Sequence, residues 1–196
     1  AEFVNILERD RDGAAHIVTQ AELDRVSASF TTPAGVRAEA EPKNLGDESV
    51  AFARWLDRNV RAHRLSGYRA VVLSLKRAGQ APGDATDEQM NAAADLADRF
   101  SHGELRVTHQ QNLVLPWVKA SELFALWQAA KASSFATPNI GLATDMIACP
   151  GGDFCALANA RSIRIAEAIQ RRFDDLDYLH DIGDIEINMS GCMNAC

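Results

Sequence analysis

Apolar and polar residues alternate over positions 68–76, a pattern that predicts a strand with one buried face. Apolar residues then recur at helical spacing over 87–100, directly after Thr86, which is expected to form a capping box with Gln89. Two short strands and a second helix are expected next, at 104–110, 112–117 and 120–132. This order of strand, helix, two strands and helix predicts a small sheet with helices on one face.

The patterns outside this unit are less regular. Positions 50–65 fit a helix and an extended segment equally well. The run 174–186 is rich in acidic residues and has no Lys or Arg, so it predicts a solvated surface or a docking patch for a redox partner. We expect helical structure within 1–30, with a break near Asp12–Gly13 and a second helical piece over 19–28. A further helix is expected over 156–172, and a short strand over 185–189.

Shifts in composition predict three parts of the chain. Residues 1–50 have the character of the tail of a preceding domain, followed by a polar linker around Pro42 and Asn44. Residues 51–133 hold the predicted sheet, and residues 134–196 hold every cysteine of the chain. The sequence therefore predicts a domain with a small sheet that is followed by a separate cysteine-bearing domain.

The composition is typical of a soluble globular protein, with 47% apolar and 24% charged residues among 196. No stretch approaches the roughly 18 uninterrupted apolar residues that a membrane-spanning helix needs, so we expect no membrane partner. A formal net charge of −7 argues against a nucleic-acid partner bound through bulk charge. The glycine-rich nucleotide-binding motifs do not occur, so any nicotinamide cofactor would be oxidised on another protein.

The cysteines lie together in the last quarter of the chain, at Cys149, Cys155, Cys192 and Cys196. Their C-x5-C and C-x3-C spacings indicate one site that is assembled from two short segments. Two disulfides would be unusual in a chain of this size, which can bury a core without them. A zinc site fits poorly, because zinc knuckles use pairs from C-x2-C to C-x4-C. The third interpretation is an iron–sulfur cluster held by four thiolates, and glycines beside the cysteines would let the backbone fold tightly around it.

Three motifs carry a resemblance to a known family. They are I-A-C-P-G-G-D-F-C at 147–155, N-M-S-G-C-M-N-A-C at 188–196 and G-E-L-R-V-T-H-Q-Q-N-L-V-L-P at 103–116. Taken together, they resemble the sirohaem-containing sulfite and nitrite reductases over roughly residues 50–196. The resemblance implies an α+β fold, with a ferredoxin-like half-module followed by an α/β domain that binds a cluster and sirohaem.

The resemblance also implies the cofactors and the reaction. The four cysteines would hold a 4Fe–4S cluster, and Cys196 would bridge this cluster to the iron of sirohaem as its axial ligand. The reaction would be the six-electron reduction of sulfite to sulfide or, as the alternative, of nitrite to ammonia. We favour sulfite from the wording of the motifs.

The family is built from two similar halves, and this chain would correspond to the second half. The basic residues that bind substrate are therefore expected outside this chain, and the chain by itself is expected to be inactive. Electrons would come from a donor protein, either ferredoxin or a flavoprotein reductase.

Three further residues are candidate sirohaem contacts. Arg106 faces away from its neighbours on the predicted strand, so it could point into a cofactor cavity or into solvent. Gln111 is a contact by motif resemblance, although its position in a turn could equally serve backbone groups. Asn194, inside the second cysteine pair, could bond a cofactor carboxylate, a cluster sulfur or its own loop. The basic residues over 54–77 could likewise face an anion or simply lie in solvent.

Two hypotheses of other classes stay open. The chain could be an iron–sulfur electron-transfer module without chemistry of its own, or a domain that zinc stabilises structurally. Sirohaem separates the reductase from the first of these, and the identity of the metal separates it from the second. Four thiolates poised for a cluster imply a reducing compartment, so we expect the protein in the cytoplasm.

Overall fold

The computed structural model describes residues 2–9, 18–47 and 49–195. The contacts within the chain form two separate units, residues 1–37 and 38–196. Among the described residues, no helix combines the length and the apolar character needed to span a membrane.

The first unit contains two helices, α1 (Glu2–Arg9) and α2 (Gln20–Ala28). The side chain of Thr19 caps α2 by accepting a hydrogen bond from the backbone N–H of Glu22. The helix expected over 19–28 is therefore confirmed. The break that we expected near Asp12–Gly13 lies outside the described residues.

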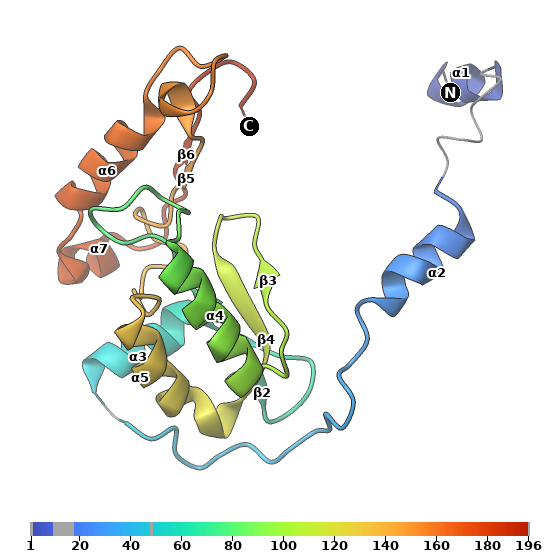
Figure 1. The fold of residues 1–196 in the computed structure, drawn as a ribbon. Coiled ribbons are helices and arrows are strands. Elements are labelled where there is room, and N and C mark those ends of the chain that lie inside the picture. Colours follow the sequence, from blue (N-terminus) through green and yellow to red (C-terminus); the bar gives the residue numbers. More distant parts are fainter. Residues whose placement is uncertain (1, 10–17, 48, 196) are drawn as a thin grey trace. The chain divides into compact units, whose positions relative to one another are not determined.

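A four-stranded antiparallel sheet forms the centre of the second unit, with the strand order β1-β2-β4-β3 (Figure 1). Its strands are β1 (Val60–Ala62), β2 (Tyr68–Leu73), β3 (Arg106–Val107) and β4 (Leu113–Lys119). The predicted strands are all present, and β1 is an additional one. It follows directly from a helix, so segment 50–65 combines both of the conformations that its pattern allowed.

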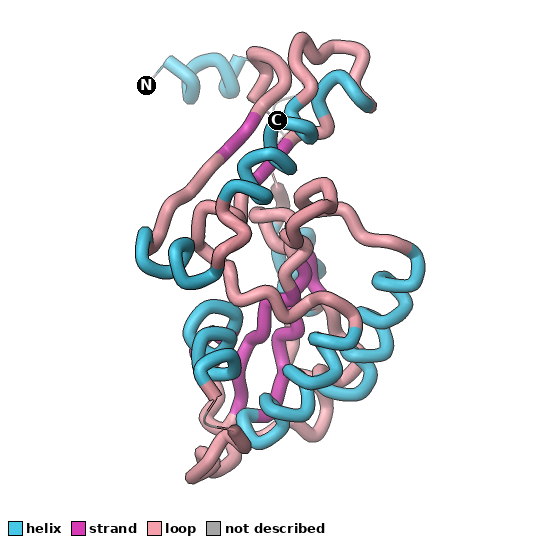
Figure 2. The backbone as a smooth tube through the Cα atoms, turned by 90° about the vertical axis from the view of Figure 1, so that its left-hand side faces the viewer, coloured by secondary structure: helices cyan, strands magenta, loops and turns pink. Residues whose placement is uncertain are grey.

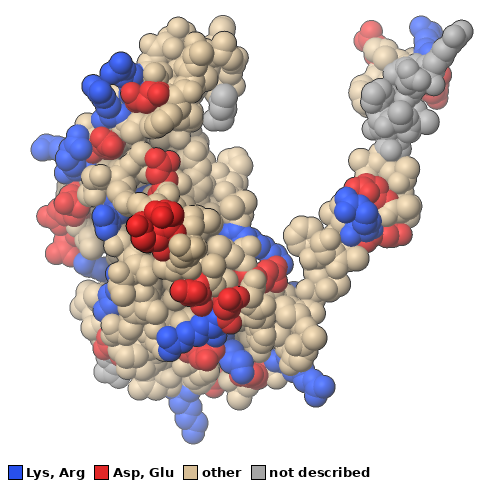
Figure 3. Space-filling model, in the orientation of Figure 1, with Lys and Arg blue, Asp and Glu red and all other residues tan. Residues whose placement is uncertain are grey.

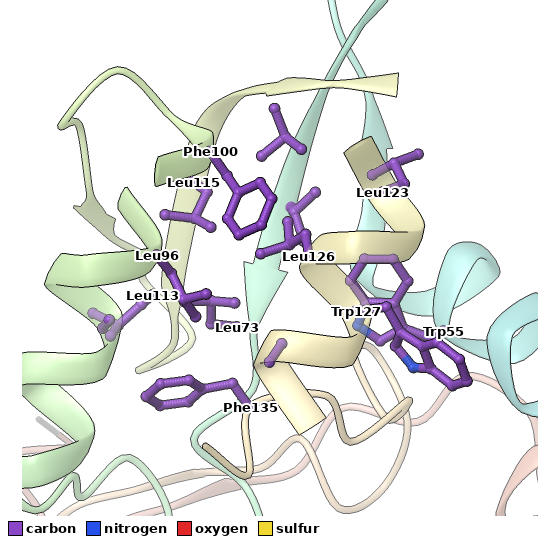
Figure 4. Close-up of a cluster of buried hydrophobic side chains, with 14 of the residues drawn as sticks. Trp55, Leu73, Leu96, Phe100, Leu113, Leu115, Leu123, Leu126, Trp127 and Phe135 are labelled. Atoms are coloured by element: carbon purple, nitrogen blue, oxygen red, sulfur yellow. The ribbon is translucent and has the colours of Figure 1, made fainter. Parts of the chain in front are cut away.

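Three helices share one hydrophobic core with this sheet. They are α3 (Val50–Asn59), α4 (Asp87–Phe100) and α5 (Leu123–Ala132), the last preceded by the 3-10 turn η2 (Ala120–Glu122). Figure 4 shows Leu73 and Leu115 of the sheet facing Phe100, Leu126 and Trp127 of the helices. The predicted sheet with helices on one face is confirmed, and so is the capping box at the start of α4.

Strand β2 ends at Leu73 and not at residue 76 as predicted. The backbone N–H of Ser74 donates to the carbonyl of Phe135, and that of Leu75 donates to the side-chain oxygen of Asn112. Because these two N–H groups have partners outside the sheet, the chain leaves the ladder although its apolar alternation continues.

Loops make up most of residues 134–196 (Figure 2). The regular elements of this segment are short: β5 (Ile147–Ala148), β6 (Asn188–Met189), the 3-10 turn η3 (Gly151–Asp153), α6 (Ser162–Arg172) and α7 (Leu176–Ile182). Strands β5 and β6 pair in parallel. The helix expected over 156–172 starts only at Ser162, because Asn159 and Ala160 donate their N–H groups to the carbonyl of Gly191 instead.

The acidic run 174–186 contains a helix, α7, that its composition did not predict. Asp175 caps this helix, and Leu179 is the buried residue of the helix itself. Two carboxylates of the run pair with arginines of α3, Asp177 with Arg54 and Asp184 with Arg58. Acidic and basic side chains are accordingly interspersed on this side of the second unit (Figure 3). Part of the predicted basic surface over 54–77 is therefore matched by carboxylates of the protein itself.

A buried ion pair joins the sheet to the segment that follows α5. The Lys76 ammonium has no exposed surface and lies 3.4 Å from the Asp145 carboxylate, and it donates to the carbonyl of Gln110 at 2.6 Å. Asp145 also accepts hydrogen bonds from the side chain of Asn112 and from the backbone of Gly141. Burial lowers the pKa of the Lys76 ammonium, although the neighbouring Asp145 carboxylate acts in the opposite direction.

This pair generates a prediction about stability. The substitution Lys76→Met leaves the Asp145 carboxylate buried without a cation, a change that typically costs about 3–5 kcal/mol. We expect the free energy of unfolding to fall by this order, as measured by urea denaturation followed by circular dichroism. The double variant Lys76→Met, Asp145→Asn removes both charges and is expected to be more stable than Lys76→Met alone. Wild-type stability in Lys76→Met would contradict this account of the pair.

Candidate functional site

The two cysteine-bearing segments lie against each other. The N–H of Cys149 donates to the carbonyl of Met189 at 3.0 Å, which continues the pairing of β5 with β6. The N–H of Gly191 donates to Cys149 Sγ at 3.0 Å, and the N–H of Asn159 donates to the carbonyl of Gly191 at 2.8 Å. Backbone hydrogen bonds therefore assemble one site from two segments that are distant in the sequence.

Glycine is required at two places where these segments touch. A Cβ added at Gly151, which has a φ of +60°, would lie 2.2 Å from Ser162 Oγ and 2.7 Å from the carbonyl oxygen of Ala160. A Cβ added at Gly191 would lie 2.9 Å from the Cα of Gly151. The absence of side chains at both positions is what lets the two segments approach this closely.

The surroundings of Cys149 stabilise a negative charge on its sulfur. Its side chain is buried, and Sγ accepts the hydrogen bond from Gly191 and lies 3.5 Å from Ser162 Oγ. The Ser162 hydroxyl and then the Gly191 N–H lower the pKa of the Cys149 thiol, and desolvation acts against them. The thiolate is the form of cysteine that binds metals, so these contacts favour a ligand at this position.

Cys155 and Cys192 are partly exposed, and both are free thiols, as is Cys149. None of these three cysteines takes part in a disulfide, so the disulfide interpretation gains no support. Among the described residues, no three His, Cys, Asp or Glu side chains are grouped closely enough to hold a single metal ion. Cys196, the predicted fourth ligand and sirohaem ligand, lies outside the described residues.

Gln111 connects the sheet to the first cysteine segment. It lies at the turn between β3 and β4 with a φ of +55°. Its side-chain Nε2 donates to the carbonyl of Ala148 at 3.1 Å, and its Oε1 accepts from the N–H of Ala148 at 3.1 Å. This turn points toward β5 and β6 in Figure 1. Gln111 thus pairs like a strand residue with the residue immediately before Cys149.

The other two candidate sirohaem contacts are placed differently. Arg106 forms an ion pair with Glu104, and the second oxygen of Glu104 accepts a hydrogen bond from the indole N–H of Trp117. Asn194 is exposed in the turn that follows Cys192. The structure brings Gln111 next to the first cysteine segment, whereas the side chain of Arg106 pairs with Glu104. The sirohaem contacts of Arg106, Gln111 and Asn194 stay predictions.

Two hollows adjoin the site. A cavity of about 340 Å³ lies between the sheet and the segments that carry β5 and β6, with His109, Asp145 and Glu186 in its lining. A second hollow, of about 430 Å³, is lined by Gln111, Met189 and Ala195 among others. The second hollow lies along the segment that carries Cys192.

The outer surface of the cysteine loops is mostly uncharged and partly apolar. Phe154, Leu157 and Met193 expose 79%, 72% and 95% of their surface. In Figure 3 the end of the second unit formed by these loops is largely free of charged side chains. Large exposed apolar side chains around a buried thiol are typical of a site that further protein covers.

Sequence reasoning did not indicate Ser162, and it considered Lys76 only as one of the basic residues over 54–77 and not as part of a buried ion pair. Neither belongs to a cysteine motif, and each acts through a contact with a residue far along the chain. The only local signal was the position of Ser162 in the expected helix that follows the first cysteine pair. Its contact with Cys149 depends on the tight turn at Gly151, which spacing alone does not reveal.

Comparison with known proteins matches the sheet-bearing part of the second unit to a family. The family model of the nitrite/sulfite reductase ferredoxin-like half domain matches residues 68–133, which run from β2 to the end of α5. This match confirms the fold class of the half-module, and it contains one of the three motifs, residues 103–116.

Several curated relatives are nitrite or sulfite reductases. The chloroplastic ferredoxin–nitrite reductase of Betula pendula is 30% identical over 114 residues, covering 56% of this chain and 18% of that protein. The corresponding protein of Zea mays is 29% identical and covers 89% of this chain and 30% of its own length. Sulfite reductase [ferredoxin] 2 of Mycolicibacterium paratuberculosis is 28% identical and covers 66% and 24%. The chain thus spans less than a third of each of these relatives.

Solved structures give the same result. The Mycobacterium tuberculosis NirA protein has a TM-score of 0.51 and 26% identity, over 81% of this chain and 27% of that chain. The dissimilatory sulfite reductase DsrI, at 16% identity and a TM-score of 0.50 over 66% of this chain and 30% of that chain, shows the shared fold alone. Residues 68–133 thus carry the ferredoxin-like half domain of nitrite and sulfite reductases, and the similarity to these proteins extends over most of the chain.

Proposed function

We propose that this chain is the cluster-binding part of a reductase that reduces sulfite or nitrite at sirohaem. The observation that carries this proposal is the hydrogen bond from Gly191 to Cys149 Sγ, which joins the two cysteine segments at a sulfur atom. Iron–sulfur clusters are held by cysteine thiolates, and hydrogen bonds to their sulfurs are one of the factors that set the reduction potential. A single backbone contact thus serves both the assembly and the electrostatics of the proposed site.

The residues that are present fit a 4Fe–4S cluster. Cys149, Cys155, Cys192 and Cys196 would be its ligands, and Cys196 would also bind the sirohaem iron. Three of these cysteines are free thiols, and Gly151 and Gly191 keep side chains away from the space between the segments. When bound, the cluster would supply single electrons to the neighbouring sirohaem.

The protein residues would orient and shield this site. Gln111 would hold the backbone of Ala148, and with it Cys149, at a constant position relative to the sheet. The N–H of Gly191 would offset the negative charge of the Cys149 thiolate. The exposed apolar residues Phe154, Leu157 and Met193 would be covered in the complete protein and would then exclude water.

Two substrates fit the family. The motifs favoured sulfite, and the Mycolicibacterium relative is a sulfite reductase. Nitrite is the second candidate, because the Betula and Zea relatives are nitrite reductases. Ferredoxin appears in the names of all three relatives, so we propose a ferredoxin as the electron donor. The thiolate ligands require a reducing compartment, and the cytoplasm satisfies this requirement.

The cofactor content tests this function. The full-length protein, purified without oxygen, is expected to contain about four cluster irons with matching acid-labile sulfide, as well as a sirohaem absorption spectrum. Cys155→Ser and Cys192→Ser are expected to lose the cluster, while Met193→Leu, on the same loop, keeps it. A cluster without sirohaem would favour the electron-transfer module, and zinc would favour the structural domain. Sulfide or ammonia production then separates sulfite from nitrite as the substrate.

The bridge from Gln111 gives a second prediction. In Gln111→Glu the carboxylate can accept from the N–H of Ala148, but it cannot donate to the carbonyl of Ala148. We expect a several-fold lower iron and sulfide content per protein, measured after purification without oxygen. Gln110→Glu is the matched control, because Gln110 is the adjacent residue, its side chain is exposed, and the substitution introduces the same charge. Equal loss in both variants would show that charge alone is responsible.

A further inference from the structure

Ser162 contributes a buried hydroxyl beside the Cys149 sulfur. It is the first residue of α6, and only 1% of its surface is exposed. Its Oγ donates to the carbonyl of Cys149 at 2.8 Å and lies 3.5 Å from Cys149 Sγ. A single hydroxyl group therefore has two acceptors of the same residue within reach.

We propose that Ser162 is a positioning residue whose hydroxyl turns from the carbonyl of Cys149 and donates a hydrogen bond to the Cys149 sulfur when that sulfur is a cluster ligand. The hydroxyl would thereby raise the reduction potential of the cluster. This inference rests on the proposed function, because it concerns a cluster held by Cys149.

The Ser162 hydroxyl can donate only one hydrogen bond at a time. A serine hydroxyl has one proton and two lone pairs, whereas a thiolate accepts hydrogen bonds only. In the structure the hydroxyl donates to the carbonyl of Cys149, and the sulfur of the same residue lies 3.5 Å from the hydroxyl oxygen. A thiolate ligand is a stronger hydrogen-bond acceptor than a backbone carbonyl. The hydroxyl of Ser162 therefore forms a stronger hydrogen bond when it turns from the carbonyl to the sulfur.

The effect on potential follows from the sign of the charge. Reduction adds an electron to the cluster and increases the negative charge on its ligand sulfurs. A hydrogen-bond donor therefore stabilises the reduced state more than the oxidised state. Removal of the donor must lower the reduction potential, and this direction does not depend on the exact hydrogen-bond length.

Burial makes the hydroxyl hard to replace. Cys149 and Ser162 expose 7% and 1% of their surface, so bulk water has little access to either atom. The Gly191 N–H already occupies one side of the sulfur. Gly151 lies where any Cβ would overlap Ser162 Oγ, which is why the hydroxyl can come this close. Loss of the hydroxyl therefore removes one donor without a substitute.

The test is a redox titration of the full-length protein, purified without oxygen and followed by electron paramagnetic resonance. Ser162→Ala is expected to lower the equilibrium constant for one-electron reduction about tenfold, which corresponds to about 59 mV. Ser162→Thr keeps the hydroxyl and is expected to restore the wild-type potential. Ser101→Ala removes a buried hydroxyl from the end of α4, in the core of the half-domain, and is expected to leave the potential unchanged.

The outcomes distinguish this inference from the proposed function. A wild-type protein without any cluster refutes the proposed function, whereas a loaded Ser162→Ala variant with the wild-type potential refutes only the role of Ser162. If Ser162→Ala binds no cluster, Ser162→Thr decides. A loaded threonine variant with the wild-type potential supports the role of the hydroxyl, and a shifted potential or a lost cluster overturns it.

Discussion

Gln111 exchanges two hydrogen bonds with the backbone of Ala148, and the position of the first cysteine depends on this exchange. The turn that carries Gln111 is itself fixed by Lys76, which donates to the carbonyl of Gln110 and pairs with Asp145. A rigid antiparallel sheet is therefore connected to a segment that has little regular structure. Both connections are polar and largely buried, so they fix direction and register in a way that apolar packing alone does not.

A small number of contacts also determines how well the Cys149 sulfur can bear negative charge. One backbone N–H and one hydroxyl face its sulfur, and both come from segments that approach only because Gly151 and Gly191 lack side chains. The Gly191 N–H and the Ser162 oxygen are in place before any metal is bound, so only the hydroxyl has to turn when the sulfur binds a metal. Electrostatics and steric clearance are thus two consequences of the same backbone arrangement.

The parts that could be predicted from the sequence are those whose causes are local. Helix α4 follows from its capping box and apolar spacing, and the relation between the cysteine segments follows from their motifs. The early end of β2 and the late start of α6 could not be predicted, since both depend on N–H groups that bond to distant carbonyl or side-chain oxygens. For the same reason the sequence left the role of Gln111 undecided and did not indicate Ser162 at all.

The cysteine segments differ from the half-domain in what holds them together. The half-domain has one large core, whereas the described residues of 134–195 bury two small clusters, around Leu142 and Leu179 and around Met146 and Ala166. Strands β5 and β6 pair over two residues each. A segment with so few apolar contacts has low local stability, and the binding energy of a metal centre adds directly to it. In the proposed enzyme the half-domain would therefore fold on its own core, while the cluster would complete the folding of the segment that binds it.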